Sequence, residues 1–333
     1  MKEINLQNLM PHLLYQFKSE HELEKTIEKV GQIFNHMREN LESYANDEKM
    51  ISAYVAYYLS TNIPKLSHVL DMVGIDLNDY ENFYDIGTGP GTFLIAAHAM
   101  NPKLNLVGID KSDLMLAQAM QILKGLGVNS DYSLGKKVGE FEKKKSLVLF
   151  SHSLNEMSEN EVGNYLKLIE DQDVLIIEPG TMEVFNKLMP IREKMIERGY
   201  EVKFPCHSNK ACQLNPATDW CHQYIMVKHN DEVERLTQKL HRNRRLMPLS
   251  VFFYSKSAEV EKCMARLIRV HKPTKFSIEW EVCMSDHSIQ RLEIPIKHYS
   301  KKEQKELLKV TAGSAVNFEV IKELSDRLRV KLI

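Results

Sequence analysis

The stretch YDIGTGPGTFLIAA, residues 84–97, decides the fold of this chain. A short apolar run leads into Gly87, Gly89 and Gly91, and a helical pattern follows the third glycine. Glycines let the backbone turn sharply and let a ligand approach it without a Cβ in the way. The next apolar run, LNLVGID, ends in Asp110, and a carboxylate at a strand end suits the two hydroxyls of a ribose.

This layout serves either a nicotinamide dinucleotide or S-adenosylmethionine. Two details favour S-adenosylmethionine. The acidic Asp85 precedes the first glycine, as is usual for methyltransferases, where it helps to hold the amino-acid end of the cofactor. The loop also lacks the final spacing of G-x-G-x-x-G. A loop that keeps this shape and binds nothing is the remaining alternative.

The surrounding sequence predicts an α/β fold with a Rossmann-like, class I methyltransferase sheet. Between residues 82 and 180 short apolar runs alternate with helical patterns, which is typical of βαβ units and a parallel sheet. We expect a helical region over 1–80, the cofactor-binding core over 81–200, and a cysteine-containing, metal-binding part over 201–333 that completes the sheet. The last part carries strand-like runs, LSVFFYSK, FSIEWEVCM and RLEIPIKHY, and we expect it to finish with two charged helices.

Composition excludes several classes of protein. Of the 333 residues, 43% are apolar and 27% charged, which is ordinary for a soluble globular protein. No run approaches the ~20 apolar residues of a membrane span, and the charged N-terminal stretch does not resemble a secretory signal. We therefore expect a cytoplasmic protein. The net charge of −1 gives no overall basic field, so RNA contact would depend on a local patch.

One such patch is KLHRNRRL, residues 239–246, whose candidates for phosphate contact are Lys239, Arg242, Arg244 and Arg245. A solvated helix face explains the same residues equally well.

The fourth strand ends in SLVLFSHSLNEM, which places Ser151, His152, Asn155 and Glu156 near the expected methyl group. We count Ser151 among the cofactor-binding candidates. His152 is a candidate general base, because the reference pKa of histidine lies near neutrality. The alternative, which we favour, is that this segment only shapes the pocket. The chain has no Asn-Pro-Pro-Tyr-like motif and no cysteine near this strand, so no catalytic residue is assigned.

Three of the five cysteines, Cys206, Cys212 and Cys221, lie in the polar stretch FPCHSNKACQLNPATDWCHQY, residues 204–224. In a reducing compartment, clustered cysteines are more often metal ligands or redox centres than disulfides. Their wide, irregular spacing is not the paired C-x₂-C of zinc ribbons and suits a larger ligand, such as an iron–sulfur cluster held by thiolates.

A fourth thiolate is needed, and Cys263 and Cys283 remain. We favour Cys283, because it ends a strand-like run and a strand edge can present a side chain to a neighbouring loop. His207 and His222, each directly after a cysteine, leave a Cys/His zinc site open as an alternative. Three unliganded buried thiols are the third possibility.

Several stretches, in the same order, resemble the mitochondrial small-ribosomal-subunit-associated methyltransferase-like family, which also has bacterial members. They are AYVAYYLSTNIPKLSHVLDMV, YDIGTGPGT, LFSHSLNEM, IIEPGTMEVF, PCHSNKACQL and DWCHQY. The resemblance runs from roughly residue 50 to residue 315. The loop CHSNKACQL departs from the family pattern, which usually has a proline after the first cysteine.

The resemblance implies a class I methyltransferase fold and association with the small ribosomal subunit or its precursor. It also implies a 4Fe–4S cluster, whose ligands match Cys206, Cys212, Cys221 and Cys283. Two functions follow as hypotheses. The first is methyl transfer from S-adenosylmethionine to ribosomal RNA or a ribosomal protein. The second is a non-catalytic assembly or RNA-binding factor in which the cluster, or a zinc ion, is structural.

Overall fold

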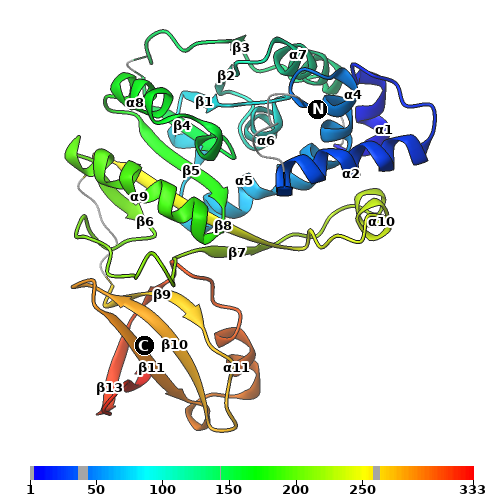
Figure 1. Cartoon of the computed structure of the whole chain (residues 1–333). Helices are drawn as coiled ribbons and strands as arrows, with labels where there is room; N and C mark the ends of the chain where they lie inside the picture. The colour runs from blue at the N-terminus through cyan, green and yellow to red at the C-terminus, as the bar shows by residue number, and fades with distance from the viewer. Residues whose placement is uncertain (1–3, 37–43, 143, 258–262) are drawn as a thin grey trace. The chain divides into compact units, whose positions relative to one another are not determined.

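The computed structural model describes residues 4–36, 44–142, 144–257 and 263–333 (Figure 1). The chain divides into two compact units, each built from two stretches of sequence. The first unit comprises Met1–Gln172 and Met226–Met247, and the second comprises Asp173–Ile225 and Pro248–Ile333. The sequence predicted parts that follow one another along the chain, with boundaries at residues 80 and 200. Each unit of the structure combines two stretches that are distant in sequence.

The first unit begins with helices that share one apolar core. Leu23, Ile27 and Val30 recur at helical spacing and pack with Tyr57 and, from a helix much later in the chain, Leu236. The helices of this region are α1 (Leu6–Leu9), η1 (Met10–His12), α2 (Glu20–His36), α4 (Glu48–Tyr54), the π-helical η3 (Val55–Leu59), α5 (Ser60–Val73), η4 (Leu77–Asp79) and the late α10 (Asp231–Lys239).

Four parallel strands follow, in the order β3-β2-β1-β4. All five residues of β1 are buried, as a central strand of a parallel sheet requires. The strands are β1 (Asn82–Ile86), β2 (Asn105–Ile109), β3 (Tyr132–Gly135) and β4 (Ser146–Ser151); the helices between and after them are α6 (Thr92–Met100), α7 (Asp113–Leu126), η5 (Leu154–Glu156) and α8 (Glu159–Leu168). This confirms the Rossmann-like α/β fold.

The register of these strands sets the position of the site. Ile86 at the end of β1 pairs with Ile109 of β2 on one side and with Phe150 of β4 on the other. The residues that follow each strand therefore meet at one edge of the sheet. In open α/β sheets this carboxyl edge is where ligands bind.

The second unit contains an antiparallel group of strands, β5-β8-β6, with β7 paired to β8. Its elements are β5 (Asp173–Pro179), α9 (Met182–Glu197), β6 (Glu201–Phe204), β7 (Gln223–Met226) and β8 (Leu246–Ser255). The polar cysteine loop runs between β6 and β7.

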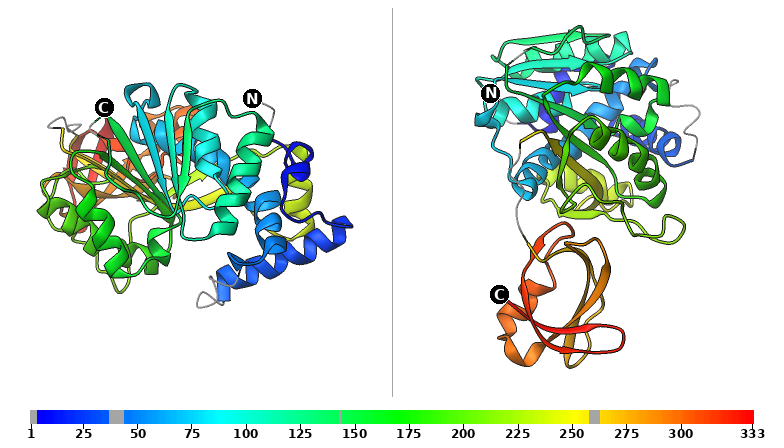
Figure 2. Two further views of the ribbon diagram at one scale, coloured as in Figure 1. Left: turned by 90° about the horizontal axis from the view of Figure 1, so that it is seen from above. Right: turned by 90° about the vertical axis from the view of Figure 1, so that its left-hand side faces the viewer.

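A second sheet in this unit has the order β12-β9-β10-β11-β14-β13 (Figure 2). Its elements are β9 (Ala265–Val270), β10 (Ser277–Met284), β11 (Ile289–Pro295), η6 (Ile296–His298), α11 (Lys301–Leu307), β12 (Ala315–Val316), β13 (Phe318–Glu323) and β14 (Leu328–Leu332). Trp280, Leu292, Phe318 and Val330 are among the side chains of its apolar core.

The expectation of two charged helices at the end of the chain is half wrong. The first is α11, but the second, FEVIKELSDRLRV, forms the hairpin of β13 and β14. Its phenylalanine, valine and isoleucine favour strands, and the Ser-Asp pair at its centre favours a turn. The many charges of this segment concealed its preference for strands.

Candidate functional site

The glycine loop joins β1 to α6, and backbone hydrogen bonds fasten it to the end of β2. Gly87 N and Thr88 N both donate to Ile109 O, at 2.8 and 2.9 Å. Gly87, Gly89 and Gly91 have φ angles of 78°, 53° and 82°, in the region that favours glycine. The loop therefore requires its glycines, as the sequence predicted, and it leads directly into α6.

Asp85 lies at the end of β1, beneath this loop, and is 1% exposed. Its Oδ2 accepts a hydrogen bond of 2.8 Å from Thr88 Oγ1. Its Oδ1 is buried and has no hydrogen-bond partner among the described residues. Burial, aided by the nearby charge of Asp110 and opposed by the Thr88 bond, raises the pKa of Asp85 to about 7. A buried carboxylate with one unpaired oxygen is a ready acceptor for a cationic ligand group.

Asp110 follows β2 and is tied into the loop. Its Oδ2 accepts a hydrogen bond from Gly89 N at 2.8 Å, and its Oδ1 accepts one from Ser112 N at 2.9 Å. Burial raises the pKa of Asp110, while these two N–H donors lower it. Ser112 Oγ donates in turn to Ala45 O at 2.6 Å, so the N-terminal helical region reaches the same edge of the sheet.

The segment after β4 packs against the glycine loop. Ser153 Oγ donates to Ile86 O at 2.8 Å, and a Cβ on Gly87 would lie 2.4 Å from Ser153 Cβ. Ser151, at the end of β4, is buried, and its Oγ has no hydrogen-bond partner among the described residues. The structure thus brings together Asp85, the glycines, Asp110 and Ser151, as the sequence predicted for a cofactor site.

His152 stands beside a lysine that the sequence did not single out. Lys65, on α5, is 4% exposed, and its Nζ lies 2.7 Å from His152 Nε2. Since an ammonium only donates, His152 Nε2 accepts this bond and its lone pair is engaged. Burial, Lys65 and Arg244 hold the pKa of His152 well below its usual range, so the imidazole is neutral. The sequence around Lys65 carries no signal that predicts its contact with His152.

The cysteine loop is fastened to its own unit at several points. Arg192 of α9 is fully buried and donates to Ser208 O and Lys210 O, at 3.2 and 2.7 Å. His207 Nε2 lies 2.7 Å from Cys283 O, and Trp220 Nε1 donates to Gly180 O at 3.0 Å. These contacts hold the loop against β10 of the second sheet and against the end of β5.

Two thiols of this region, Cys221 and Cys283, have raised pKa values. Burial raises the pKa of Cys221, and charges at Cys206, Cys212 and Cys283 raise it further. Burial first, then Cys206 and Cys212, raise the pKa of Cys283 to about 12. Cys263, by contrast, places its Sγ 3.4 Å from His207 Nδ1. In the described part of the chain no three His, Cys, Asp or Glu side chains are arranged tightly enough for one metal ion.

Arg192 gives the cysteine loop a buried positive charge. Its guanidinium pairs with Glu193 at 2.5 Å, and its Nε has no hydrogen-bond partner among the described residues. The charge of Arg192 lowers the pKa of the Cys206 thiol against the larger effect of burial, which raises it. The sequence did carry a signal for this residue. Phe185, Leu188, Arg192 and Met195 recur at helical spacing, which places the arginine on the buried stripe of α9.

The basic patch near α10 is already engaged within the chain. Lys239 Nζ lies 3.0 Å from Glu24 Oε1, and Arg245 Nη2 lies 2.9 Å from Glu234 Oε2. Arg242 donates to the Tyr58 hydroxyl, and the Arg244 guanidinium lies 5.0 Å from the centroid of the Tyr58 ring. An RNA phosphate would have to compete with these partners, and phosphate binding by the four residues stays a prediction.

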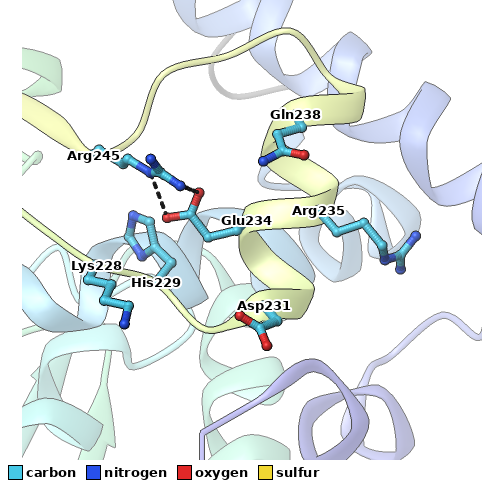
Figure 3. A pocket seen from close by; sticks show the side chains of 7 residues that line it. All are labelled: Lys228, His229, Asp231, Glu234, Arg235, Gln238 and Arg245. Atoms are coloured by element: carbon cyan, nitrogen blue, oxygen red, sulfur yellow. Dashed lines mark hydrogen bonds and ion pairs between the residues drawn. The ribbon is translucent and has the colours of Figure 1, made fainter.

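A polar hollow of about 290 Å³ opens beside this patch (Figure 3). Glu234 and Arg245 pair at its wall. Its lining residues are Lys228, His229, Asp231, Glu234, Arg235, Gln238 and Arg245, and none of them belongs to the glycine loop. The hollow is therefore a feature of α10 and its flanks, separate from the carboxyl edge of the parallel strands.

No helix in the described ranges combines the length and apolar character that crossing a membrane requires. The comparison with curated proteins finds carboxy-S-adenosyl-L-methionine synthase of Nautilia profundicola, 28% identical over 85 residues. The match covers 26% of this chain and 35% of that enzyme, so the chain spans about a third of the relative's length.

Solved structures resemble the chain at low identity. One is precorrin-6y C5,15-methyltransferase of Geobacter metallireducens, with a TM-score of 0.37, 12% identity, and coverage of 57% of this chain and 87% of that one. Another is a SAM-dependent methyltransferase of Thiobacillus denitrificans in complex with S-adenosyl-L-homocysteine, with a TM-score of 0.32, 14% identity, and coverage of 57% and 90%. A family model described as mitochondrial small ribosomal subunit Rsm22 matches residues 48–311.

Proposed function

Because the chain belongs to the family of mitochondrial small ribosomal subunit Rsm22, we propose that it binds S-adenosylmethionine and acts on the small ribosomal subunit as a methyltransferase. The observation that carries the proposal is the buried, unpartnered Oδ1 of Asp85 beside the glycine loop. The substrate is ribosomal RNA or a ribosomal protein of that subunit or of its precursor. The cytoplasmic location expected from the sequence stays a prediction.

The residues at the carboxyl edge fit the cofactor group by group. Asp85 Oδ1 supplies an acceptor for the ammonium of the methionine part. Asp110 supplies a carboxylate for the ribose hydroxyls, exchanging its bond to Gly89 N for bonds to the ligand. Ser151 Oγ supplies one more unpaired polar group at the end of β4. The glycines leave the backbone open to close approach.

Catalysis by this chain would consist mainly of positioning. When bound, S-adenosylmethionine supplies an electrophilic methyl group. The carboxyl edge holds that donor, and a nucleophile brought to it reacts without the entropic cost of a free encounter. We assign His152 to shaping this space, since Lys65 engages its Nε2 lone pair.

The affinity for S-adenosylmethionine is expected to rise with pH between about 5 and 7. The folded, ligand-free protein keeps Asp85 protonated below its pKa of about 7, and pairing with an ammonium requires the carboxylate. Binding therefore releases a proton, and the association constant should rise by about tenfold per pH unit before levelling off. Titration calorimetry at several pH values measures this, and Asp85→Asn should abolish the slope. An equally steep slope in that variant would assign the proton to another group.

The same shift has a consequence for stability. Asp85 has a folded pKa of about 7 against an ordinary value of 3.8, so the folded state holds its proton over a pH range in which the unfolded state has lost it. The contribution of this group to stability is thus greatest at low pH and declines as the pH rises from about 4 to about 7. An ammonium group bound beside the Asp85 carboxylate would offset this loss of stability at higher pH.

For the cysteines we propose a 4Fe–4S cluster on Cys206, Cys212, Cys221 and Cys283. The support is that Cys206 and Cys212 are near enough to Cys221 and Cys283 to raise the pKa of both, and that four thiolates are the usual ligand set of such a cluster. A zinc site using a histidine is the alternative. His207 is a poor candidate for it, because Cys283 O and Cys263 Sγ both lie against its ring nitrogens.

Arg192→Met is expected to weaken the cluster site strongly. The variant removes a fully buried cation that donates to two carbonyls of the loop and whose charge acts on Cys206, so we expect a loss of about 3 kcal/mol of unfolding free energy. Denaturant unfolding together with the iron content after exposure to air measures the effect. Glu193→Gln is the matched control, because that half-exposed partner should contribute less than about 1 kcal/mol. Equal losses in both variants would contradict this role of Arg192.

The alternative function is a non-catalytic assembly or RNA-binding factor with a structural cluster or zinc ion. One observation favours it. The histidine at the end of β4 is neutral, but its Nε2 lone pair is occupied by Lys65, which leaves the candidate base engaged. A factor of this kind would still bind the small subunit and would retain the cofactor site as a structural element.

Calorimetry with S-adenosylmethionine, followed by sedimentation with purified ribosomal subunits, tests the two halves of the proposal separately. We expect one cofactor bound per chain and co-sedimentation with small rather than large subunits. Co-sedimentation without cofactor binding would remove the methyltransferase assignment. Cofactor binding without co-sedimentation would remove the ribosomal one.

A further inference from the structure

The second sheet of the second unit closes on itself. β12 and β13 stand at opposite ends of its strand order, yet only Asn317 separates them in the chain. One bent stretch therefore pairs with β9 at its beginning and with β14 at its end. Since its two edges belong to the same stretch, the sheet is a small closed barrel (Figure 2). With β12 and β13 counted as one bent strand, the barrel has five strands.

The connections of this barrel are those of an OB fold. β9, β10 and β11 form an antiparallel meander, and α11 lies between the third and fourth strands. The last strand, β14, pairs in parallel with β11 and antiparallel with β13. OB barrels bind oligonucleotides and oligosaccharides on the face of their second and third strands and on two flanking loops, of which the loop between the first two strands is one.

That first loop, residues 271–276, is held by hydrogen bonds of its own and presents an aromatic ring. Thr274 Oγ1 accepts hydrogen bonds from Phe276 N and Ser277 N, at 3.2 and 3.0 Å, and closes a tight turn. Phe276 O accepts from Ile296 N at 3.0 Å. With its backbone fixed in this way, the Phe276 side chain is still 74% exposed. An exposed ring on a fixed loop is a platform on which a base can stack.

One cationic side chain lies beside this ring, and two more belong to the same loop or to the segment bonded to it. Lys275 Nζ lies 5.7 Å from the Phe276 ring centroid. Lys272 is exposed on the same loop. Lys297 is exposed and follows Ile296, whose N–H donates to Phe276 O. Among the residues that the structure describes, none of these three lysines forms an ion pair. Three arginines elsewhere on the barrel do: Arg327 pairs with Glu279, Arg329 with Glu293 and Arg269 with Glu281.

We propose that this basic aromatic loop, Lys272, Lys275, Phe276 and Lys297, binds single-stranded RNA. The inference rests on the proposed ribosomal function and adds a second contact surface to it. Phe276 stacks on an unpaired base, and the three lysines contact the adjoining phosphates. Compared with the patch at α10, where Lys239 and Arg245 already pair with glutamates, these lysines need not give up a partner.

The barrel also carries a ligand of the proposed cluster. Cys283 lies near the end of β10, whereas the basic aromatic loop precedes the first residue of that strand, Ser277. At about 3.3 Å per residue, the loop and the cysteine lie roughly 20 Å apart along β10. A cluster on Cys283 would thus fasten one end of the barrel while the other end stays open to RNA.

Fluorescence anisotropy with the full chain and a labelled twelve-nucleotide oligouridine tests the proposal. We expect Phe276→Ala to weaken binding at least about fivefold. The triple change of Lys272, Lys275 and Lys297 to alanine should lower the slope of log K against log salt by about 2, since each phosphate contact on a single strand contributes roughly 0.7. Ile321→Ala and Lys322→Ala, at exposed positions on β13 of the same barrel, are the matched controls and should change neither quantity.

Thermal melting of each variant establishes that the barrel is still folded. An oligouridine affinity equal in wild type, Phe276→Ala and the triple variant would overturn the proposal. So would a triple variant with an unchanged salt slope. If these variants also co-sediment normally with small subunits, the ribosomal function stands and only the RNA surface is lost. Loss of co-sedimentation without any oligouridine binding would point instead to an acidic protein partner and would equally overturn the proposal.

Discussion

Anaerobically purified Cys283→Ser protein is expected to contain less than about one iron per chain, against about four irons and four sulfides in the wild type. A serine hydroxyl does not replace a thiolate ligand at neutral pH, so the cluster loses one of its four attachments. Because Cys283 is on β10 and the other three ligands are on the loop between β6 and β7, the variant also loses the bond that joins these segments. Its unfolding free energy should fall by several kcal/mol.

Cys263→Ser is the matched control for this experiment. Cys263 is partly buried like Cys283, but its Sγ lies against His207 Nδ1, and charges at Cys206 and Cys212 act on Cys283. We expect this variant to keep its iron. Equal iron in both variants would contradict the ligand assignment. If the wild type contained one zinc per chain and no sulfide, the site would be a zinc site and the cluster assignment would be wrong.

Gly89→Ala is expected to lower the affinity for S-adenosylmethionine by about tenfold to a hundredfold. Gly89 has a φ of +53°, and an added Cβ meets no heavy atom within 4 Å in the free protein. The substitution therefore leaves the packing of the free protein intact and extends a methyl group into space that the cofactor would occupy. The cost to folding should be limited to backbone strain, about 1 kcal/mol.

Gly74→Ala provides the comparison. Gly74 ends α5 with a φ of +76°, and its Cβ would also meet nothing within 4 Å. Both variants should lose similar stability in denaturant, yet only Gly89→Ala should lose cofactor affinity in calorimetry. Wild-type affinity in Gly89→Ala would show that the cofactor does not approach the glycine loop.

The fold of the first unit was predictable because its decisive signals are local. The apolar runs that precede Asp85, Asp110 and Ser151 each end at the carboxyl edge of a parallel sheet, so recognising the strands was enough to bring these residues together. The role of the three glycines can be predicted from the local sequence alone. Their positive φ angles follow from the turn that joins β1 to α6.

The remainder depends on contacts between residues far apart in the chain. Lys65 and His152 are 87 residues apart, and neither local sequence indicates the other. Phe276 lies within a polar stretch, and only the closure of the barrel shows that it belongs to the loop between the first two barrel strands. The patch at Lys239 was visible as a run of charge, but its partners on α2 were not. The many charges of the hairpin formed by β13 and β14 suggest a surface helix, and only the pairing of the two strands shows otherwise.

The most direct test of the account is methyl transfer itself. Protein purified without oxygen is incubated with S-adenosylmethionine labelled in its methyl group and with small-subunit particles taken at successive stages of assembly. We predict label in the RNA or in a protein of these particles, and much less label with Gly89→Ala at a cofactor concentration near the wild-type Kd. Cofactor binding with no label in any particle would contradict methyl transfer and leave the chain as a ribosome-binding factor that retains the cofactor site.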